Sequence, residues 1–259
     1  MTFLRFDRVT HHYFSEKSVT KSLADVSFSV KEGEFLSIIG PSGCGKSTIL
    51  SLIAGLLKET RGEITIENEA LEKRSTKVGY MLQQDYLFPW KTIMDNILLG
   101  PKITNKIDDK TIQRAQDLLK EVQLSHIANH YPSQLSGGMR QRIALVRTLM
   151  TDPEILLFDE PFSALDYVTK LQLENVISHL LKTYKKTAIL VTHDLSEAIS
   201  MSDRIILMDP SPVMVKKICQ VPESLRESKP FYVRRHQAFQ ALFDEVWKEF
   251  NTEEKRESL

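Results

Sequence analysis

Cysteine is nearly absent from this chain of 259 residues, which contains only Cys44 and Cys219. Two distant cysteines cannot form a disulfide framework, and such a low number is typical of proteins kept in a reducing cytosol. Long apolar runs are also missing. The longest, over residues 49–57, is interrupted by Ser51 and is far shorter than the roughly 18 to 20 residues of a membrane span. Charged residues interrupt the N-terminal segment, so we expect neither a signal peptide nor a membrane-spanning helix.

An excess of charge of one sign is lacking as well, because 34 Lys and Arg residues balance 34 Asp and Glu residues. Proteins that bind nucleic acid usually carry a net positive charge or a basic face, so this composition does not favour nucleic acid as a partner. The apolar share of 42% is sufficient for a substantial core. The length fits one large domain or a domain with an inserted lobe.

Glycine is scarce too, with 10 residues, but it is concentrated in residues 40–48 and 135–142. The first segment, GPSGCGKST, matches the phosphate-binding pattern G-x-x-x-x-G-K-[ST]. In this pattern glycines let backbone N–H groups approach phosphates, the lysine reaches the β- and γ-phosphates, and the next hydroxyl ligates Mg²⁺. We therefore predict an ATP- and Mg²⁺-binding phosphate loop formed by Gly40, Pro41, Ser42, Gly43, Cys44, Gly45, Lys46, Ser47 and Thr48. Cys44 is either simply one small residue of the loop or, since a helix N-terminus can lower a thiol pKa, a site of alkylation, and we assign it no catalytic role.

Short apolar runs predict strands at 34–39, 154–159 and 187–191, and alternating patterns predict further strands at the N-terminus and near residues 28–30 and 64–67. Helical spacing predicts helices over 47–57, through 112–122, after Ser136, through 171–181 and from Phe239 to Trp247. Four prolines predict a loop-rich stretch beyond Met208. All-apolar strands alternating with helices indicate a mostly parallel α/β sheet covered by helices on both faces.

Two carboxylates stand at the end of the apolar strand predicted at 154–159: Asp159 is its last residue, and Glu160 follows immediately. At this position Asp159 is suited to ligate the Mg²⁺ held by Ser47, and Glu160 to activate a hydrolytic water. Acids after a strand also cap helices, and Pro161 fits that simpler interpretation. The presence of the phosphate loop favours the catalytic one.

From about residue 3 to 250 the chain resembles the ATPase subunits of ABC transporters. The motifs occur in the family's order: the phosphate loop, Gln83, the signature segment Leu135–Arg142, Asp159 with Glu160, the segment 163–166, and His193. The run Leu-Ser-Gly-Gly-x-x-x-Arg, which ends at Arg142, is highly specific to this family. The resemblance implies a P-loop NTPase core with an antiparallel β portion near the N-terminus and an inserted helical subdomain.

The resemblance also implies that two chains sandwich two ATP molecules head to tail. Ser136, Gly137 and Gly138 of one subunit would contact the γ-phosphate bound by the phosphate loop of the other. A serine hydroxyl and glycine amides at a helix N-terminus suit such an anion site. Asp166 would bridge the two sites.

Three further roles rest on the same resemblance. Gln83 would sense Mg²⁺ and the attacking water, and we prefer it to Gln84 because it lies seven residues before Trp90, as in related importers. His193 would contact the γ-phosphate. Tyr13 would stack on adenine, although His12 and Phe14 flank it.

The run Leu87-Phe88-Pro89-Trp90 is similar to the ATPases of nitrate, sulfonate and taurine importers, a group that includes importers of thiamine pyrimidine precursors. Phe88 and Trp90 would either pack in the core or line a groove for a cytoplasmic helix of a membrane subunit. We divide the single ABC ATPase domain, residues 1–259, into an ATP-binding core (1–84 and 151–209), a helical subdomain (85–150) and a C-terminal tail and helix (210–259).

The predicted function is that of the ATP-hydrolysing homodimer of a bacterial ABC importer, peripheral to the cytoplasmic face of the membrane. Its partners would be two permease subunits and, indirectly, an extracytoplasmic substrate-binding protein, with no nucleic acid. The alternative is a soluble ABC-type ATPase acting on nucleic acid or ribosomes, which usually carries coiled coils, zinc modules or a second cassette. A P-loop kinase would not need the signature segment, and a non-hydrolysing binding module would not need Glu160 and His193.

Overall fold

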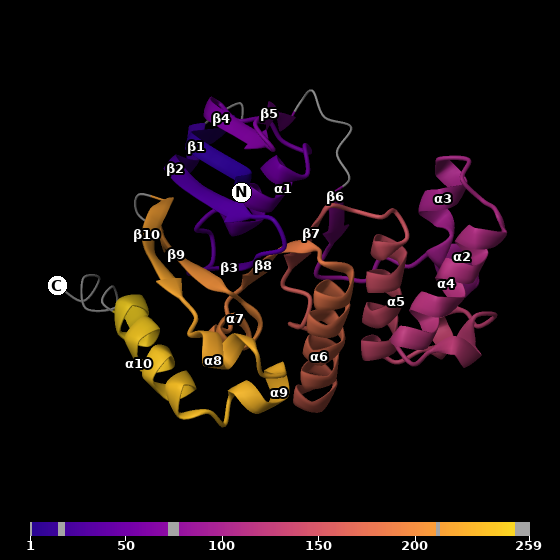
Figure 1. The fold of residues 1–259 in the computed structure, drawn as a ribbon. Helices are drawn as coiled ribbons and strands as arrows, with labels where there is room; N and C mark the ends of the chain where they lie inside the picture. The colour runs from indigo at the N-terminus through magenta and orange to yellow at the C-terminus, as the bar shows by residue number, and fades with distance from the viewer. Residues whose placement is uncertain (1, 15–18, 72–77, 211–212, 252–259) are drawn as a thin grey trace. The chain divides into compact units, whose positions relative to one another are not determined.

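The computed structural model describes residues 2–14, 19–71, 78–210 and 213–251 (Figure 1). The chain divides into two compact units. The first unit comprises residues 1–76 and 187–259, and the second comprises residues 77–186.

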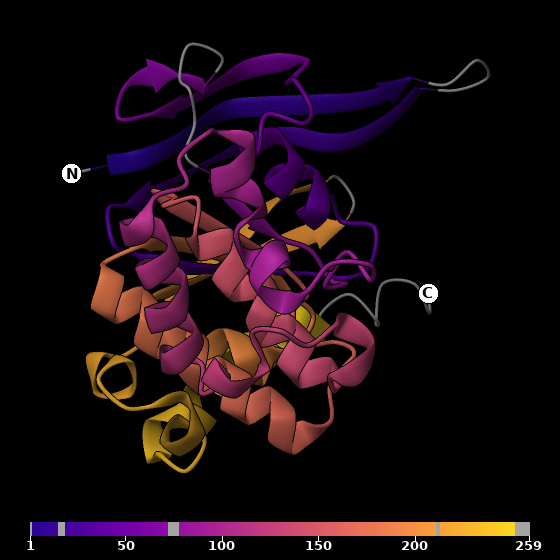
Figure 2. The same cartoon turned by 90° about the vertical axis from the view of Figure 1, so that its right-hand side faces the viewer.

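The first unit begins with an antiparallel sheet in the order β2-β1-β4-β5. Two long strands, β1 (Thr2–Phe14) and β2 (Val19–Lys31), run side by side in Figure 2, and β4 (Arg61–Ile66) and β5 (Glu69–Ala70) complete the sheet. Phe6 pairs with Phe28 across β1 and β2, and the two rings stack with centroids 4.5 Å apart. The antiparallel portion predicted near the N-terminus is therefore confirmed.

The other sheet of the first unit holds the strands that lead into the predicted site. Its strands in this unit lie in the order β10-β9-β3-β8. All residues of β3 (Phe35–Ile39) and β8 (Thr187–Thr192) are buried, which explains their continuous apolar sequence. The two strands are parallel, and Ile39 pairs with Thr192 at their carboxyl ends. The loops that follow them, one starting at Gly40 and the other at His193, consequently leave the same edge of the sheet.

The C-terminal part of the first unit contains a strand that the sequence analysis missed. Beyond β9 (Arg204–Pro210), residues Val213–Gln220 form β10, which pairs with β9 in antiparallel register. The loop-rich prediction is wrong here. Among the described residues near this strand, Pro210 ends β9 and Pro222 follows β10, so neither of these prolines removes an N–H from the interior of β10.

The helices of the first unit are α1 (Lys46–Ile53), α7 (Leu195–Met201), α8 (Glu223–Arg226), α9 (Pro230–Val233) and α10 (Gln237–Asn251). Helix α1 ends four residues before the predicted Leu57, because Gly55 has a left-handed backbone with φ of 69° that stops the helix. Phe239, Leu242 and Val246 of α10 are buried in one core cluster with residues of β3, α7 and β9.

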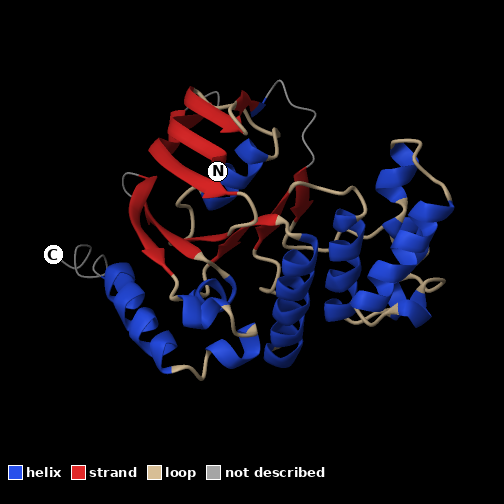
Figure 3. Ribbon diagram, in the orientation of Figure 1, coloured by secondary structure: helices blue, strands red, loops and turns tan. Residues whose placement is uncertain are grey.

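The second unit is mostly helical (Figure 3). It contains the parallel pair β6 (Val78–Met81) and β7 (Ile155–Asp159). Its helices are α2 (Ile93–Ile97), α3 (Leu99–Ile103), α4 (Asp109–Glu121), α5 (Gly137–Leu149) and α6 (Tyr167–Tyr184), with short 3₁₀ turns at Ser125–Ile127 and Pro132–Gln134. The predicted helix after Ser136 is confirmed as α5. Among the described residues, no helix combines the length and apolar character needed to cross a bilayer.

Candidate functional site

The phosphate loop, residues 40–48, connects β3 to α1 in the first unit. The Lys46 ammonium donates hydrogen bonds to the carbonyl oxygens of Gly40 at 2.7 Å and Pro41 at 2.8 Å. Its side chain is consequently folded into the curve of the loop and is only 7% exposed. The loop therefore holds a positive charge next to the N-terminus of α1, where helix partial charges also favour anions.

Two glycines of the loop cannot carry a side chain. A Cβ atom on Gly45, whose φ is 73°, would lie 2.6 Å from the Ser22 carbonyl oxygen. A Cβ atom on Gly40 would lie 2.6 Å from the Cys44 Sγ atom. Gly43 has a φ of 81° and open space around its Cα. The loop thus combines glycine positions without side chains and the positive charge of Lys46, an arrangement that fits the phosphate chain of a nucleotide.

The thiol of Cys44 is buried in the same loop. Burial raises its pKa more than the neighbouring Lys46 ammonium lowers it. Desolvation of the thiolate thus opposes the lower pKa that the helix N-terminus and the Lys46 charge favour.

Tyr13, the predicted adenine-stacking residue, lies beside α1. Its hydroxyl is 3.2 Å from the Thr48 Oγ1 atom, which is also 2.9 Å from the Ser22 Oγ atom. The Tyr13 ring is 45% exposed and meets the His11 ring edge to face. Tyr13 is thus tethered to α1 while part of its surface stays accessible.

His193 is exposed directly after β8. The next residue, Asp194, caps α7 by accepting a 2.7 Å hydrogen bond from the Ser196 N–H, which fixes the backbone after the histidine. His193 lines a cavity of about 280 Å³ together with Phe243, Trp247 and Phe250 of α10. Helical spacing predicted a helix from Phe239 to Trp247, but nothing in the sequence indicated that this helix reaches the loop of His193.

In the second unit, Gln83 lies close to the two predicted acids. The Gln83 Nε2 atom donates to the Ser163 Oγ atom at 3.0 Å, and Ser163 donates in turn to the Glu160 carbonyl oxygen at 3.0 Å. The Tyr80 hydroxyl donates to the Asp159 carboxylate at 3.3 Å. Glu160 has a φ of 47°, an uncommon backbone for a residue with a side chain and one that often occurs at functional sites.

The signature segment, residues 135–142, forms the start of α5. Ser136 is exposed and caps the helix, its Oγ atom accepting a 3.4 Å hydrogen bond from the Met139 N–H. A Cβ atom on Gly138 would lie 2.1 Å from the Thr169 Cγ2 atom of α6. Asp166 caps α6 through the Val168 and Thr169 N–H groups, and hydrogen bonds from Thr169 lower the pKa of its carboxyl. The signature segment and Asp166 are therefore brought together by the packing of Gly138 on Thr169.

Comparison with known proteins identifies the family. Residues 23–163 match the family model described as ABC transporter. The chain belongs to this family. It is 49% identical over 257 residues to an uncharacterized ABC transporter ATP-binding protein, YtlC, of Bacillus subtilis (strain 168), and the match covers 99% of each chain. It is 37% identical to an aliphatic sulfonates import ATP-binding protein of Bacillus anthracis, covering 94% of each chain.

A solved structure agrees with this assignment. It is a dimeric ATP-binding cassette in a post-hydrolysis state, bound to ADP and Pi. The superposition has a TM-score of 0.73 at 35% identity and covers 85% of this chain and 99% of that chain. The P-loop NTPase fold and the ATPase class predicted from the sequence are thereby confirmed.

The predicted site residues of this ABC ATPase fall into two sets. Within the first unit, the fold gathers Tyr13, the phosphate loop and His193. Within the second, it gathers Gln83, the two acids, the signature segment and Asp166. The described residues contain no group of three or more His, Cys, Asp or Glu side chains that would hold a metal alone.

Proposed function

We propose that this ABC ATPase is the homodimeric energy-supplying subunit of a bacterial importer and completes each ATP site with two chains. The observation that carries the proposal is the exposed Ser136 cap at the start of α5. A helix N-terminus favours anions because its backbone N–H groups and partial positive charge are directed at the ligand. The dimeric state of the similar cassette supports the same arrangement. Ser136, Gly137 and Gly138 of one chain would contact the γ-phosphate on the phosphate loop of the other.

Each residue has a distinct role in the proposed reaction. Lys46 and the loop N–H groups bind the β- and γ-phosphates and stabilise the charge that develops on them. Glu160 orients the water for in-line attack, and His193 contacts the γ-phosphate. Mg²⁺, when bound, neutralises phosphate charge. Tyr13 would stack on adenine, and Asp166 would connect the two sites of the dimer.

The proposed membrane partners are two permease subunits, with an extracytoplasmic binding protein acting through them at the cytoplasmic face of the membrane. The side chain of Trp90 is 71% exposed and its ring lies 5.2 Å from that of Phe88, so this aromatic pair offers an anchor for a permease helix. The helical subdomain, residues 85–150, would carry this contact. Nitrate, a sulfonate, taurine or a thiamine pyrimidine precursor is the proposed cargo class, and the named sulfonate relatives favour a sulfonate.

The experiment is ATP-dependent dimerisation of a Glu160→Gln variant, measured by light scattering. The variant should bind ATP, form a dimer and hydrolyse ATP at least about a hundredfold more slowly than the unchanged chain, since the residue that orients water is lost. Turnover at the unchanged rate would remove Glu160 from this role. Co-purification with nucleic acid instead of permeases would favour the alternative of a soluble ABC-type ATPase.

A further inference from the structure

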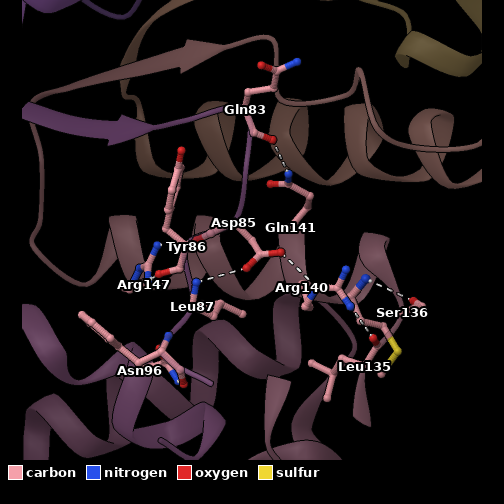
Figure 4. A network of polar contacts seen from close by, with 12 residues as sticks. Gln83, Asp85, Tyr86, Leu87, Asn96, Leu135, Ser136, Arg140, Gln141 and Arg147 are labelled. Carbon is pink, nitrogen blue, oxygen red and sulfur yellow. Dashed lines mark hydrogen bonds and ion pairs between the residues drawn. The ribbon is translucent and has the colours of Figure 1, made fainter. Parts of the chain in front are cut away.

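Residues 83–88, here called the Gln83 segment, are attached to α5 by three side chains of that helix (Figure 4). The Gln141 Nε2 atom donates to the Gln83 carbonyl oxygen at 2.9 Å. Two turns apart on the same helix face, Arg140 bonds the Asp85 carboxylate and Arg147 bonds the carbonyl oxygens of Asp85 and Tyr86 at 2.6 and 2.7 Å. The segment is thereby attached along its length to the helix that begins at the signature segment.

Arg140, itself part of the signature segment, differs from the other two side chains because it also contacts Leu135 at the start of that segment. Its Nε atom donates to the Asp85 Oδ2 atom at 2.9 Å, while its Nη1 atom donates to the Leu135 carbonyl oxygen at 2.8 Å. Leu135 immediately precedes Ser136 in the sequence. The planar Arg140 guanidinium thus joins Asp85, two positions after Gln83, to Leu135, which directly precedes Ser136.

Asp85 is itself held in place. Its Oδ1 atom accepts a 3.1 Å hydrogen bond from the Leu87 N–H, which leaves Oδ2 directed at Arg140. The side chains of Asp85 and Arg140 are 24% and 36% exposed, so solvent only partly screens the ion pair. A displacement of the Gln83 segment would therefore move the Arg140 guanidinium. Through the guanidinium it would also move the Leu135 peptide group, which directly precedes Ser136.

We propose that Arg140 is a positioning residue that couples the Gln83 segment to Ser136 of the signature segment. The inference rests on the proposed function, in which Gln83 senses the nucleotide of its own chain and Ser136 meets that of the partner. Through Asp85 and Arg140, the state of one ATP site sets how well the chain presents Ser136 to the other. A lysine at position 140 retains the charge but not the two-pronged donor geometry, so it cannot hold both acceptors.

The test is a double-mutant cycle in the full-length chain. Asp85→Asn, Arg140→Gln and the double variant are made with and without Glu160→Gln, and Arg140→Lys is added. Arg114→Gln is the matched control, because Arg114 forms an ion pair with Asp152 at 3.2 Å in the same unit. Three quantities are measured: ATP affinity of the monomer with a fluorescent ATP analogue, the ATP concentration for half-maximal dimerisation, and ATP turnover.

Each single variant should raise the ATP concentration for half-maximal dimerisation about two- to fivefold and lower turnover by a similar factor, as expected for one partly exposed ion pair. The double variant should show no further loss, because both changes break the same link. Arg140→Lys should recover less than half of the effect. Monomer ATP affinity and the Arg114→Gln control should remain unchanged.

Additive losses in the double variant, full recovery with Arg140→Lys or an equal loss of monomer ATP affinity would overturn the inference. These outcomes are separate from a failure of the proposed function. If the Glu160→Gln chain does not dimerise with ATP at all, the two-chain site is wrong. In that case the turnover cycle in the otherwise unchanged chain still decides whether Asp85 and Arg140 act as a pair.

Discussion

Gly138 of α5 lies so close to Thr169 of α6 that a Cβ atom on the glycine would be 2.1 Å from the Thr169 Cγ2 atom. This contact packs the first turn of α5 against α6, the helix capped by Asp166. The small residue is therefore required by packing as well as by the proposed approach of a phosphate.

Gly138→Ala should consequently destabilise the protein by about 1–3 kcal/mol, since α5 or Thr169 must move to make room. Adding Thr169→Ala should restore much of this loss, because the nearest remaining side-chain atom, the Thr169 Cβ, would lie 3.5 Å away. Gly137→Ala is the control, since its Cβ would lie 3.7 Å from the Leu165 Cδ2 atom, an ordinary contact. Urea unfolding measures all three. Equal stability of Gly138→Ala and Gly137→Ala would contradict the packing argument.

A second prediction concerns the thiols. Burial raises the pKa of both Cys44 and Cys219, so the reactive thiolate is a smaller fraction at any given pH than for an ordinary cysteine. At pH 8 the folded protein should react with iodoacetamide at least about tenfold more slowly than the unfolded chain in urea. Mass spectrometry of the alkylated peptides gives both rates. Rapid labelling of Cys44 in the folded protein would mean that the loop exposes its thiolate.

Some of the site follows directly from local sequence, and some does not. The phosphate loop was predictable because its glycines and Lys46 act through their own backbone and immediate neighbours. Strand β10 was not predicted because it lies at the edge of its sheet beside β9, and its sequence alternates only weakly between apolar and polar residues. The Asp85–Arg140 pair joins residues far apart in the sequence, and nothing in either residue's neighbourhood indicates the other.

Trp247 provides a reporter for the third prediction, because it lines the same cavity as His193. The chain has two tryptophans, so Trp90→Phe leaves Trp247 as the sole emitter. Addition of ATP with Mg²⁺ should change its emission by roughly 10% or more, since contact of His193 with the γ-phosphate alters the surroundings of the indole.

His193→Ala in the Trp90→Phe background should remove most of this change while ATP still binds. An identical change without the histidine would show that Trp247 responds to another part of the first unit. If Trp247 emission did not change on addition of ATP in either variant, this would argue against contact between His193 and the bound nucleotide.

The fourth prediction addresses Lys46. Its ammonium is held by the Gly40 and Pro41 carbonyl oxygens, so the charge is already positioned in the loop. Lys46→Ala should weaken ATP binding at least about tenfold and reduce turnover more strongly, because the charge also stabilises the transition state. Lys216→Ala is a control for loss of a lysine elsewhere in the unit. Titration with a fluorescent ATP analogue measures the affinity, and unchanged binding would contradict the assigned role.

In the proposed dimer each ATP is held by the phosphate loop of one chain and Ser136 of the other, and the decisive variant is Ser136→Arg. Nucleotide affinity and dimerisation are measured on the same sample, with Ser133→Arg, an exposed serine in the preceding turn, as the matched control. Ser136→Arg should bind ATP as a monomer with unchanged affinity but neither dimerise nor turn over ATP, while the control does both. Normal hydrolysis by Ser136→Arg would contradict the shared site.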